Sequence, residues 1–125
     1  MAIKNNISAV ILTNTTNGNR DNLISELKKE EGGLSGDPLN QISTNMIKKF
    51  YKELNSKIPI IGVGGVNSGK SAYEKILAGA SLLQLYTGFV YRGPSTAKEI
   101  KKELIEILKA EGISNIKDAI GKSVN

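Results

Sequence analysis

The stretch Ile58-Pro59-Ile60-Ile61-Gly62-Val63-Gly64-Gly65-Val66 is a short apolar run that ends in glycines. Such a run is typical of a buried strand in a parallel sheet. Glycines allow a tight turn and let main-chain N–H groups approach an anion without a Cβ in the way. A helical pattern opens near Asn67 or Ser68, and its first unpaired N–H groups would add to the attraction. The stretch therefore predicts a site for a phosphorylated ligand, with a plain strand–turn–helix connection as the alternative.

Strand-like and helix-like segments alternate along the rest of the chain. The apolar runs predict strands at residues 7–12, 58–63 and 81–86, and the helical spacing predicts helices at 43–54, 68–78 and 95–111. Residues 22–31 are expected to form either a helical turn or an excursion of the loop, and a short helical turn is expected at 115–121. This order predicts an α/β fold with right-handed crossovers and parallel strands. The first and third strands would leave open, apolar edges, which favours pairing with another chain.

The helices carry their own capping and packing signals. Ser43 is expected to cap the 43–54 helix, and Gly79 is expected to stop the 68–78 helix. The side chains expected to face the core are Met46, Ile47, Phe50 and Leu54 in the first helix, Ala72, Ile76 and Leu77 in the second, and Ala97, Ile100, Leu104, Ile107 and Leu108 in the third.

Composition narrows the class of protein. The 125 residues amount to one domain, and 39% of them are hydrophobic, which is enough for a core. The chain has no cysteine and no histidine, so no metal site is predicted, and a reducing cytosol is the expected location. The net charge is +5, but lysines alternate with glutamates, as in residues 98–109, which indicates a solvated helix face rather than a nucleic-acid surface. No apolar run approaches the ~20 residues that span a bilayer, and no secretory signal is visible.

Several separated motifs occur in a fixed order. They are Thr13-Asn14-Thr15-Thr16, Gly32-Gly33-Leu34-Ser35-Gly36 with Pro38-Leu39, Pro59-Ile60-Ile61-Gly62-Val63-Gly64-Gly65, Ala78-Gly79-Ala80-Ser81-Leu82, Gln84-Leu85-Tyr86-Thr87-Gly88 and Asp118-Ala119-Ile120-Gly121. Each is weak alone, because glycine-ended strands recur in many phosphate-binding barrels. Together, from about Ile7 onward, they resemble the C-terminal portion of a quinone-dependent (class 2) dihydroorotate dehydrogenase.

The resemblance implies a fold and an activity. The family fold is a (β/α)8 TIM barrel that holds FMN, and this chain would supply its last three β/α units. Residues 1–125 would then form a partial FMN-binding barrel domain. Family members oxidise dihydroorotate to orotate in de novo pyrimidine synthesis and pass the electrons to a quinone. Phosphate commonly binds in such barrels at the loops after strands seven and eight, which would be the turns at 62–65 and 86–88 here.

The resemblance also implies roles for individual residues. Contacts to FMN are expected from Thr13, Gly36, Gly64, Gly65, Tyr86 and Thr87. Contacts to dihydroorotate or orotate are expected from Asn14 and Thr15, because an amide and a hydroxyl offer donors and acceptors to a planar polar ring. Without the other motifs, residues 13–16 would be interpreted as a polar turn, Gly36 as a flexible joint and Tyr86 as an aromatic residue at the barrel rim.

Other parts of the family pattern are not matched in this sequence. The family's serine base, a flavin-contacting lysine, the substrate-holding asparagines and the membrane-associated N-terminal helices all belong to upstream segments. Ser35 is not that serine, so no catalytic residue is assigned. We therefore expect a fragment that is inactive alone and cytoplasmic, whereas intact members are peripheral on the inner membrane. The alternatives are a non-catalytic FMN- or phosphate-binding half-barrel, a subunit that self-associates or complements a separate N-terminal chain, and a gene remnant with no role.

Overall fold

Three parallel strands form the single sheet of the computed structural model, which describes residues 3–18 and 20–124. The strands are β1 (Val10–Leu12), β2 (Ile60–Val63) and β3 (Ala80–Gln84), in the order β1-β2-β3. Both pairings are parallel, which confirms the predicted sheet. β2 is central, so β1 and β3 each leave one edge open, as expected for consecutive units taken from a barrel.

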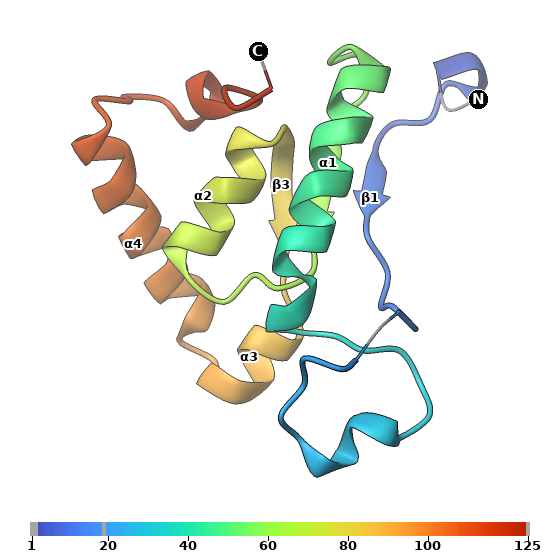
Figure 1. The fold of residues 1–125 in the computed structure, drawn as a ribbon. Coiled ribbons are helices and arrows are strands. Elements are labelled where there is room, and N and C mark those ends of the chain that lie inside the picture. Colours follow the sequence, from blue (N-terminus) through green and yellow to red (C-terminus); the bar gives the residue numbers. More distant parts are fainter. Residues whose placement is uncertain (1–2, 19, 125) are drawn as a thin grey trace.

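The helices lie on one side of this sheet (Figure 1). They are α1 (Asn40–Leu54), α2 (Gly69–Leu77), the short α3 (Thr87–Arg92) and α4 (Thr96–Ala110). Short 3-10 helices occur at Ile3–Asn5, Glu26–Lys29, Asp37–Leu39 and Ile116–Ala119. α1 and α2 contact the strands, and α4 packs against α2. Within the described ranges, no helix has the length and apolar character needed to cross a bilayer.

The covered face of the sheet carries the main core. Val10 pairs with Ile60, and Ile60 pairs with Ala80, so these three side chains form a row beneath α1. Ile47 and Leu54 pack onto that row from α1. Ile47, Ile60 and Ala80 are all buried to 1% exposure or less, whereas Val10 at the β1 edge is partly buried.

The opposite face of the sheet is bare. Ile11 pairs with Ile61, and Ile61 pairs with Leu82, so a second apolar row crosses all three strands. Ile11 is 58% exposed and Leu82 is 62% exposed. The structure therefore has the layered arrangement of a barrel wall, with helices on its outer face and an apolar inner face left open.

The first helix differs from the prediction at its start. α1 begins at Asn40, directly after the 3-10 helix that contains Pro38, so Ser43 is not its cap. Ser43 is instead buried one turn before Ile47, and its hydroxyl donates a 2.5 Å hydrogen bond to the Val63 carbonyl. Helical spacing places Ser43 and Ile47 on the buried side. Two residues predicted to face the core, Met46 and Phe50, point partly outward, at 39% and 37% exposure.

Other boundaries also shift. β1 and β3 are shorter than the predicted strands at 7–12 and 81–86. Thr87 and Gly88 do not close a strand but open α3, and Ala97 is exposed on α4 rather than packed in the core. The prediction for α2 is confirmed, with Ser68 as its cap and the backbone of Gly79 at a φ of +116° after its end. The helical turn expected near the C-terminus is also confirmed.

Candidate functional site

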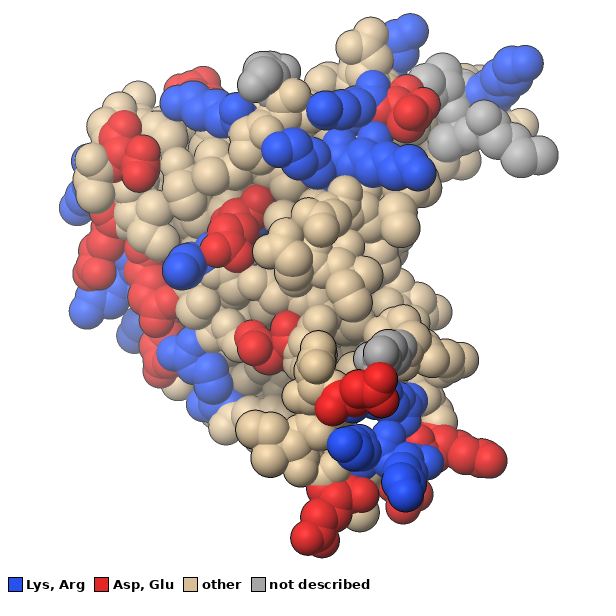
Figure 2. All heavy atoms as spheres, in the orientation of Figure 1, with Lys and Arg blue, Asp and Glu red and all other residues tan. Residues whose placement is uncertain are grey.

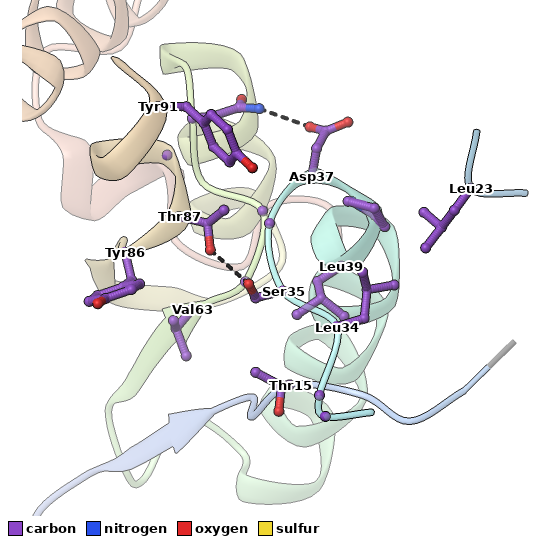
Figure 3. A pocket seen from close by; sticks show the side chains of 18 of the residues that line it. Thr15, Leu23, Leu34, Ser35, Asp37, Leu39, Val63, Tyr86, Thr87 and Tyr91 are labelled. Carbon is purple, nitrogen blue, oxygen red and sulfur yellow. Dashed lines mark hydrogen bonds between the residues drawn. The ribbon is translucent and has the colours of Figure 1, made fainter. Parts of the chain in front are cut away.

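The carboxyl ends of the three strands open into one pocket of about 1050 Å³ (Figure 3). Its lining comes from the loops that follow β1, β2 and β3. All eight residues assigned to a site from the sequence line it: Thr13, Asn14, Thr15, Gly36, Gly64, Gly65, Tyr86 and Thr87. Segments separated by up to 74 positions thus meet at one place, as the barrel prediction requires.

The first wall of the pocket is the glycine turn after β2. Gly64 and Gly65 have φ values of +110° and +72°, which favour glycine. A Cβ on Gly65 would come within 2.6 Å of the main chain of Asn40, the first residue of α1. The turn therefore lies directly against the start of α1, and Gly65 leaves no room for a side chain.

The second wall is the start of α3, after β3. Gly88 lies so close to the first turn that a Cβ would come within 2.5 Å of the Val66 carbonyl oxygen. Tyr86 precedes the helix, and its side chain is 80% exposed and directed away from the other labelled side chains (Figure 3). The contribution of Tyr86 to the pocket is therefore mainly its backbone.

The third wall is the loop that leads into α1. Gly36 has a φ of +86°, and a Cβ there would meet the Thr87 methyl group at 2.9 Å. The Thr87 hydroxyl donates a 2.9 Å hydrogen bond to Ser35 Oγ (Figure 3). In the same way, the Asn67 amide donates to Asp37 Oδ1 at 2.9 Å. These two bonds join this loop to the two turns, and sequence reasoning missed both because they link distant positions.

Main-chain N–H groups of both turns remain available to a ligand. Across residues 3–18 and 20–124, the N–H groups of Gly64, Gly65, Tyr86 and Thr87 have no hydrogen-bond acceptor. Neighbouring groups are engaged, since Thr13 N–H donates to the Val63 carbonyl at 3.2 Å. Successive unpaired N–H groups at a concave turn attract anions. The pocket thus presents donors from two adjacent turns.

The start of α2 does not add to this set of donors, so the prediction that it would is wrong. Ser71 Oγ accepts hydrogen bonds from the N–H groups of Asn67 and Ser68, each at 3.0 Å. The Gly69 N–H donates to a Glu103 carboxylate oxygen at 2.5 Å. The packing of α4 against α2 brings this carboxylate to the positive end of α2. Ser71, the third residue of the helix, accepts the two preceding N–H groups. A second anion there would meet a negative charge.

The residues after β1 form the remaining side of the pocket. Asn14 Oδ1 accepts the Thr15 N–H at 2.7 Å, which holds the Asn14 side chain against the following backbone. Gly33 lies against the Thr15 side chain with no room for a Cβ. Both Asn14 and Thr15 are exposed. The amide and hydroxyl predicted to contact a substrate are thus held by local packing at the accessible rim of the pocket.

The arginines that line the pocket are tied to the protein. Arg20 donates to the carbonyls of Lys28, Glu30 and Gly32 and so holds the 17–33 loop together. Arg92 donates to the Asn67 carbonyl and forms a 2.9 Å ion pair with Glu99. Hydrogen bonding from Ser95 lowers the pKa of the Glu99 carboxyl, and Arg92 adds to the effect.

The charge over the molecule is mixed in sign. Figure 2 shows basic and acidic side chains interspersed along the top, the left side and the bottom of one face, with a largely uncharged area toward the centre and right. This distribution agrees with the alternating lysines and glutamates in the sequence. Because both arginines are engaged, the pocket's unpaired donors are main-chain N–H groups rather than arginine side chains.

Comparison with known proteins identifies a family of barrel enzymes, in agreement with the geometry of the sheet and pocket. The family model described as dihydroorotate dehydrogenase matches residues 1–108. The chain is 46% identical over 122 residues to "Dihydroorotate dehydrogenase (quinone), mitochondrial" of Arabidopsis thaliana. This match covers 97% of this chain and 26% of the relative. It is 49% identical over 115 residues to the protein of the same name in Mus musculus, covering 92% of this chain and 29% of the relative.

A solved structure agrees in three dimensions. The chain superimposes on a crystal structure of DHODH in complex with ferulenol from Eimeria tenella with a TM-score of 0.93 and 45% identity. That match covers 97% of this chain and 32% of the other. The chain thus spans between about a quarter and a third of the length of these relatives. Its three β/α units are part of a (β/α)8 barrel, and the chain belongs to the dihydroorotate dehydrogenase family.

Proposed function

We propose that this chain forms the FMN-phosphate and substrate-contacting portion of a quinone-dependent dihydroorotate dehydrogenase. The observation that supports this most is the set of unpaired N–H groups on the two turns of one pocket. FMN is a phosphorylated ligand whose phosphate is a dianion at neutral pH. Backbone donors in a glycine turn suit such a group. A side chain at Gly65 would clash with the main chain of Asn40 and displace the turn that carries these donors.

The residues of the pocket would hold FMN from three sides. The N–H groups of Gly64, Gly65, Tyr86 and Thr87 would donate to the phosphate, which carries most of the charge. Thr13 and Gly36 would contact the rest of the cofactor. When bound, FMN supplies the two-electron redox chemistry that converts dihydroorotate to orotate. The chain's own contribution is to bind and orient the cofactor at the strand ends.

Asn14 and Thr15 would contact dihydroorotate or orotate. The bond from the Thr15 N–H to Asn14 Oδ1 restrains the Asn14 side chain, so the ordering cost on ligand binding is reduced. The substrate, the quinone acceptor and a place in pyrimidine synthesis come from the names and family of the relatives, and they belong to this proposal.

Titration calorimetry of the purified chain with FMN tests the proposal, with riboflavin as the matched ligand that lacks the phosphate. We expect FMN to bind with a Kd below about 1 mM and at least tenfold more tightly than riboflavin, because the turns recognise the phosphate. Equal affinities, or no heat of binding up to several millimolar FMN, would contradict the proposal.

We further propose that the chain alone does not oxidise dihydroorotate. The Ser35 oxygen already accepts a hydrogen bond from the Thr87 hydroxyl. The sequence contains no histidine or cysteine to serve as a base. Anaerobic mixing of the FMN-loaded chain with dihydroorotate should leave the visible flavin absorbance unchanged. Bleaching would refute inactivity while supporting the assignment to the enzyme.

The bare sheet face favours a second candidate function, that of a complementing subunit. The row Ile11, Ile61 and Leu82 has no cover among the described residues, and both sheet edges are open. A separate chain that carries the other barrel strands would cover the row, and in its absence a second copy would do so. Both chains would act in the cytoplasm under this proposal. Co-purification with such a chain, together with restored turnover, is the expected result.

A further inference from the structure

We propose that Lys75, a fully buried lysine on α2, is a positioning residue that holds the Gly64–Gly65 turn in its anion-binding shape and attracts the anion electrostatically. The inference rests on the proposed binding of a phosphate at this turn. It goes beyond that proposal because Lys75 does not line the pocket and carries no assigned role.

The contacts of Lys75 converge on the first turn of α1. Its ammonium group donates to the Asn40 carbonyl at 3.1 Å, to Asn40 Oδ1 at 3.0 Å and to Thr44 Oγ1 at 2.9 Å. The Thr44 hydroxyl in turn donates to the Asn40 carbonyl at 2.7 Å. All three donors of the lysine therefore have neutral oxygen partners on α1.

Asn40 transmits these contacts to the turn. Lys75 holds its side-chain oxygen, and the neighbouring Glu74 accepts its NH2 group at 3.1 Å. The other side of Asn40 lies against Gly65, where a Cβ would come within 2.6 Å of it. One residue thus separates the buried cation from the turn, and a rotation of Asn40 would move Gly65.

The charge of Lys75 is costly, and packing alone does not require it. Its side chain is 0% exposed, and its polar contacts are to neutral atoms rather than to a carboxylate. Burial lowers the pKa of Lys75 from 10.5 to about 8, and the Glu74 carboxylate opposes part of that effect. A methionine would fill the same space without a buried charge. The buried ammonium group would attract a phosphate bound at the turn, because electrostatic attraction is strong in a low-dielectric interior.

The test compares the wild-type chain with Lys75→Met and with Lys70→Met, an exposed lysine on the same helix that controls for net charge. At pH 7 we expect Lys75→Met to lose about tenfold in FMN affinity. Lys70→Met should change the affinity by less than twofold, and riboflavin affinity should not respond to either variant. Equal FMN affinities for Lys75→Met and Lys70→Met would overturn the inference.

A pH series separates this role from simple stabilisation. The charged group acting on Lys75 is Glu74 on α2, while α1 presents Asn40 and Thr44, and the turn presents glycines that do not titrate. FMN affinity of the wild type should fall as pH rises from 7 to 9.5, because Lys75 loses its proton in that window. The phosphate is already a dianion there. Lys75→Met should show no such fall, and a parallel fall in both proteins would count against the inference.

Hydrogen exchange gives a readout that does not need FMN. In the ligand-free chain, Lys75→Met should raise amide exchange in a peptide spanning residues 62–67 at least threefold over Lys70→Met. Thr44→Val, which keeps the lysine and removes one acceptor, should give a smaller rise in the same peptide. If wild-type protein fails to bind FMN while these rises occur, the proposed function fails and the positioning role stands. Unchanged exchange in both variants overturns the positioning role.

Discussion

Gly88 touches the main chain of Val66, and a Cβ on the glycine would come within 2.5 Å of the Val66 carbonyl oxygen. This contact brings the start of α3 against the turn after β2. Two main-chain turns that follow different strands thereby line one side of the pocket together. The geometry of the proposed phosphate site depends on their close approach.

We expect Gly88→Ala to separate the two turns. The overlap with Val66 should lower the free energy of unfolding by about 1–3 kcal/mol and weaken FMN binding at least tenfold. The control is Gly112→Ala, which has open space around it but a φ of +66°. It should lose about 1–2 kcal/mol of stability with FMN affinity unchanged. Calorimetric titration of both variants checks this, and equal FMN affinities would show that the contact is irrelevant to binding.

Lys75 should make stability depend on pH in a defined direction. Its folded pKa of about 8 lies below its ordinary value of 10.5, so between these pH values the unfolded chain binds the proton more readily. The contribution of Lys75 to the free energy of unfolding therefore rises with pH through this window. The total rise is about 3 kcal/mol.

Urea unfolding of wild type and Lys75→Met at pH 7 and pH 10 measures this contribution. The free energy of unfolding of Lys75→Met, taken relative to wild type, should be about 2–3 kcal/mol lower at pH 10 than at pH 7. A stability difference that stays constant with pH would mean that Lys75 does not titrate in this window.

The bare sheet face should make the isolated chain self-associate. Leu82 lies in the exposed apolar row, and a charge placed there would resist burial against a second copy. By light scattering, wild-type chain should exceed the 13.4 kDa monomer mass, and Leu82→Glu should approach it. Ile105→Glu, at a 52% exposed position on α4, should leave the mass as in wild type. A monomeric wild type at high concentration would argue against the complementing role.

Asn14 should affect the substrate more than the cofactor. Asn14→Ala removes an amide from the rim of the pocket, and we expect about tenfold weaker orotate binding to the FMN-loaded chain. Asn17→Ala is the control, since Asn17 is exposed on the same loop but does not line this pocket. Orotate-induced change in the flavin spectrum reports binding. Equal effects of the two variants would remove the substrate role of Asn14.

Regular hydrophobic patterns in the sequence were sufficient to predict most of the fold. The apolar run before Gly64 predicted a strand of the parallel sheet, and the helical spacing of apolar residues predicted the helices that cover it. The start of α2 was predicted near Asn67 or Ser68 because the helical pattern begins there, and the structure shows Ser68 as its cap. α3 was missed because six residues make fewer than two turns, too few for a helical period to be visible. Ser43 was taken for a cap because the helix was expected to start after a loop, whereas Pro38 starts it earlier.

The sequence predicted which positions line the pocket, but it did not predict the hydrogen bonds that hold those positions in place. Glycine patterns and a family resemblance identified the turns around Gly65 and Thr87. The partners that hold them came only from tertiary packing. Lys75 resembles any solvated lysine in the sequence, yet it is buried beneath Asn40. Glu103 resembles part of a charged helix face, yet it caps α2 thirty-four positions earlier and so excludes that helix end from the phosphate site.

We propose that unpaired main-chain N–H groups on the two turns hold the phosphate of FMN. Amide chemical shifts of the ¹⁵N-labelled chain, followed during titration with FMN, inorganic phosphate and riboflavin, report on these groups one by one. We expect the amide signals of Gly64, Gly65, Tyr86 and Thr87 to shift with FMN and with phosphate but not with riboflavin. The signal of Gly69, whose N–H already donates to Glu103, should not move. Shifts at Gly69 with none at Gly65 and Thr87 would contradict it.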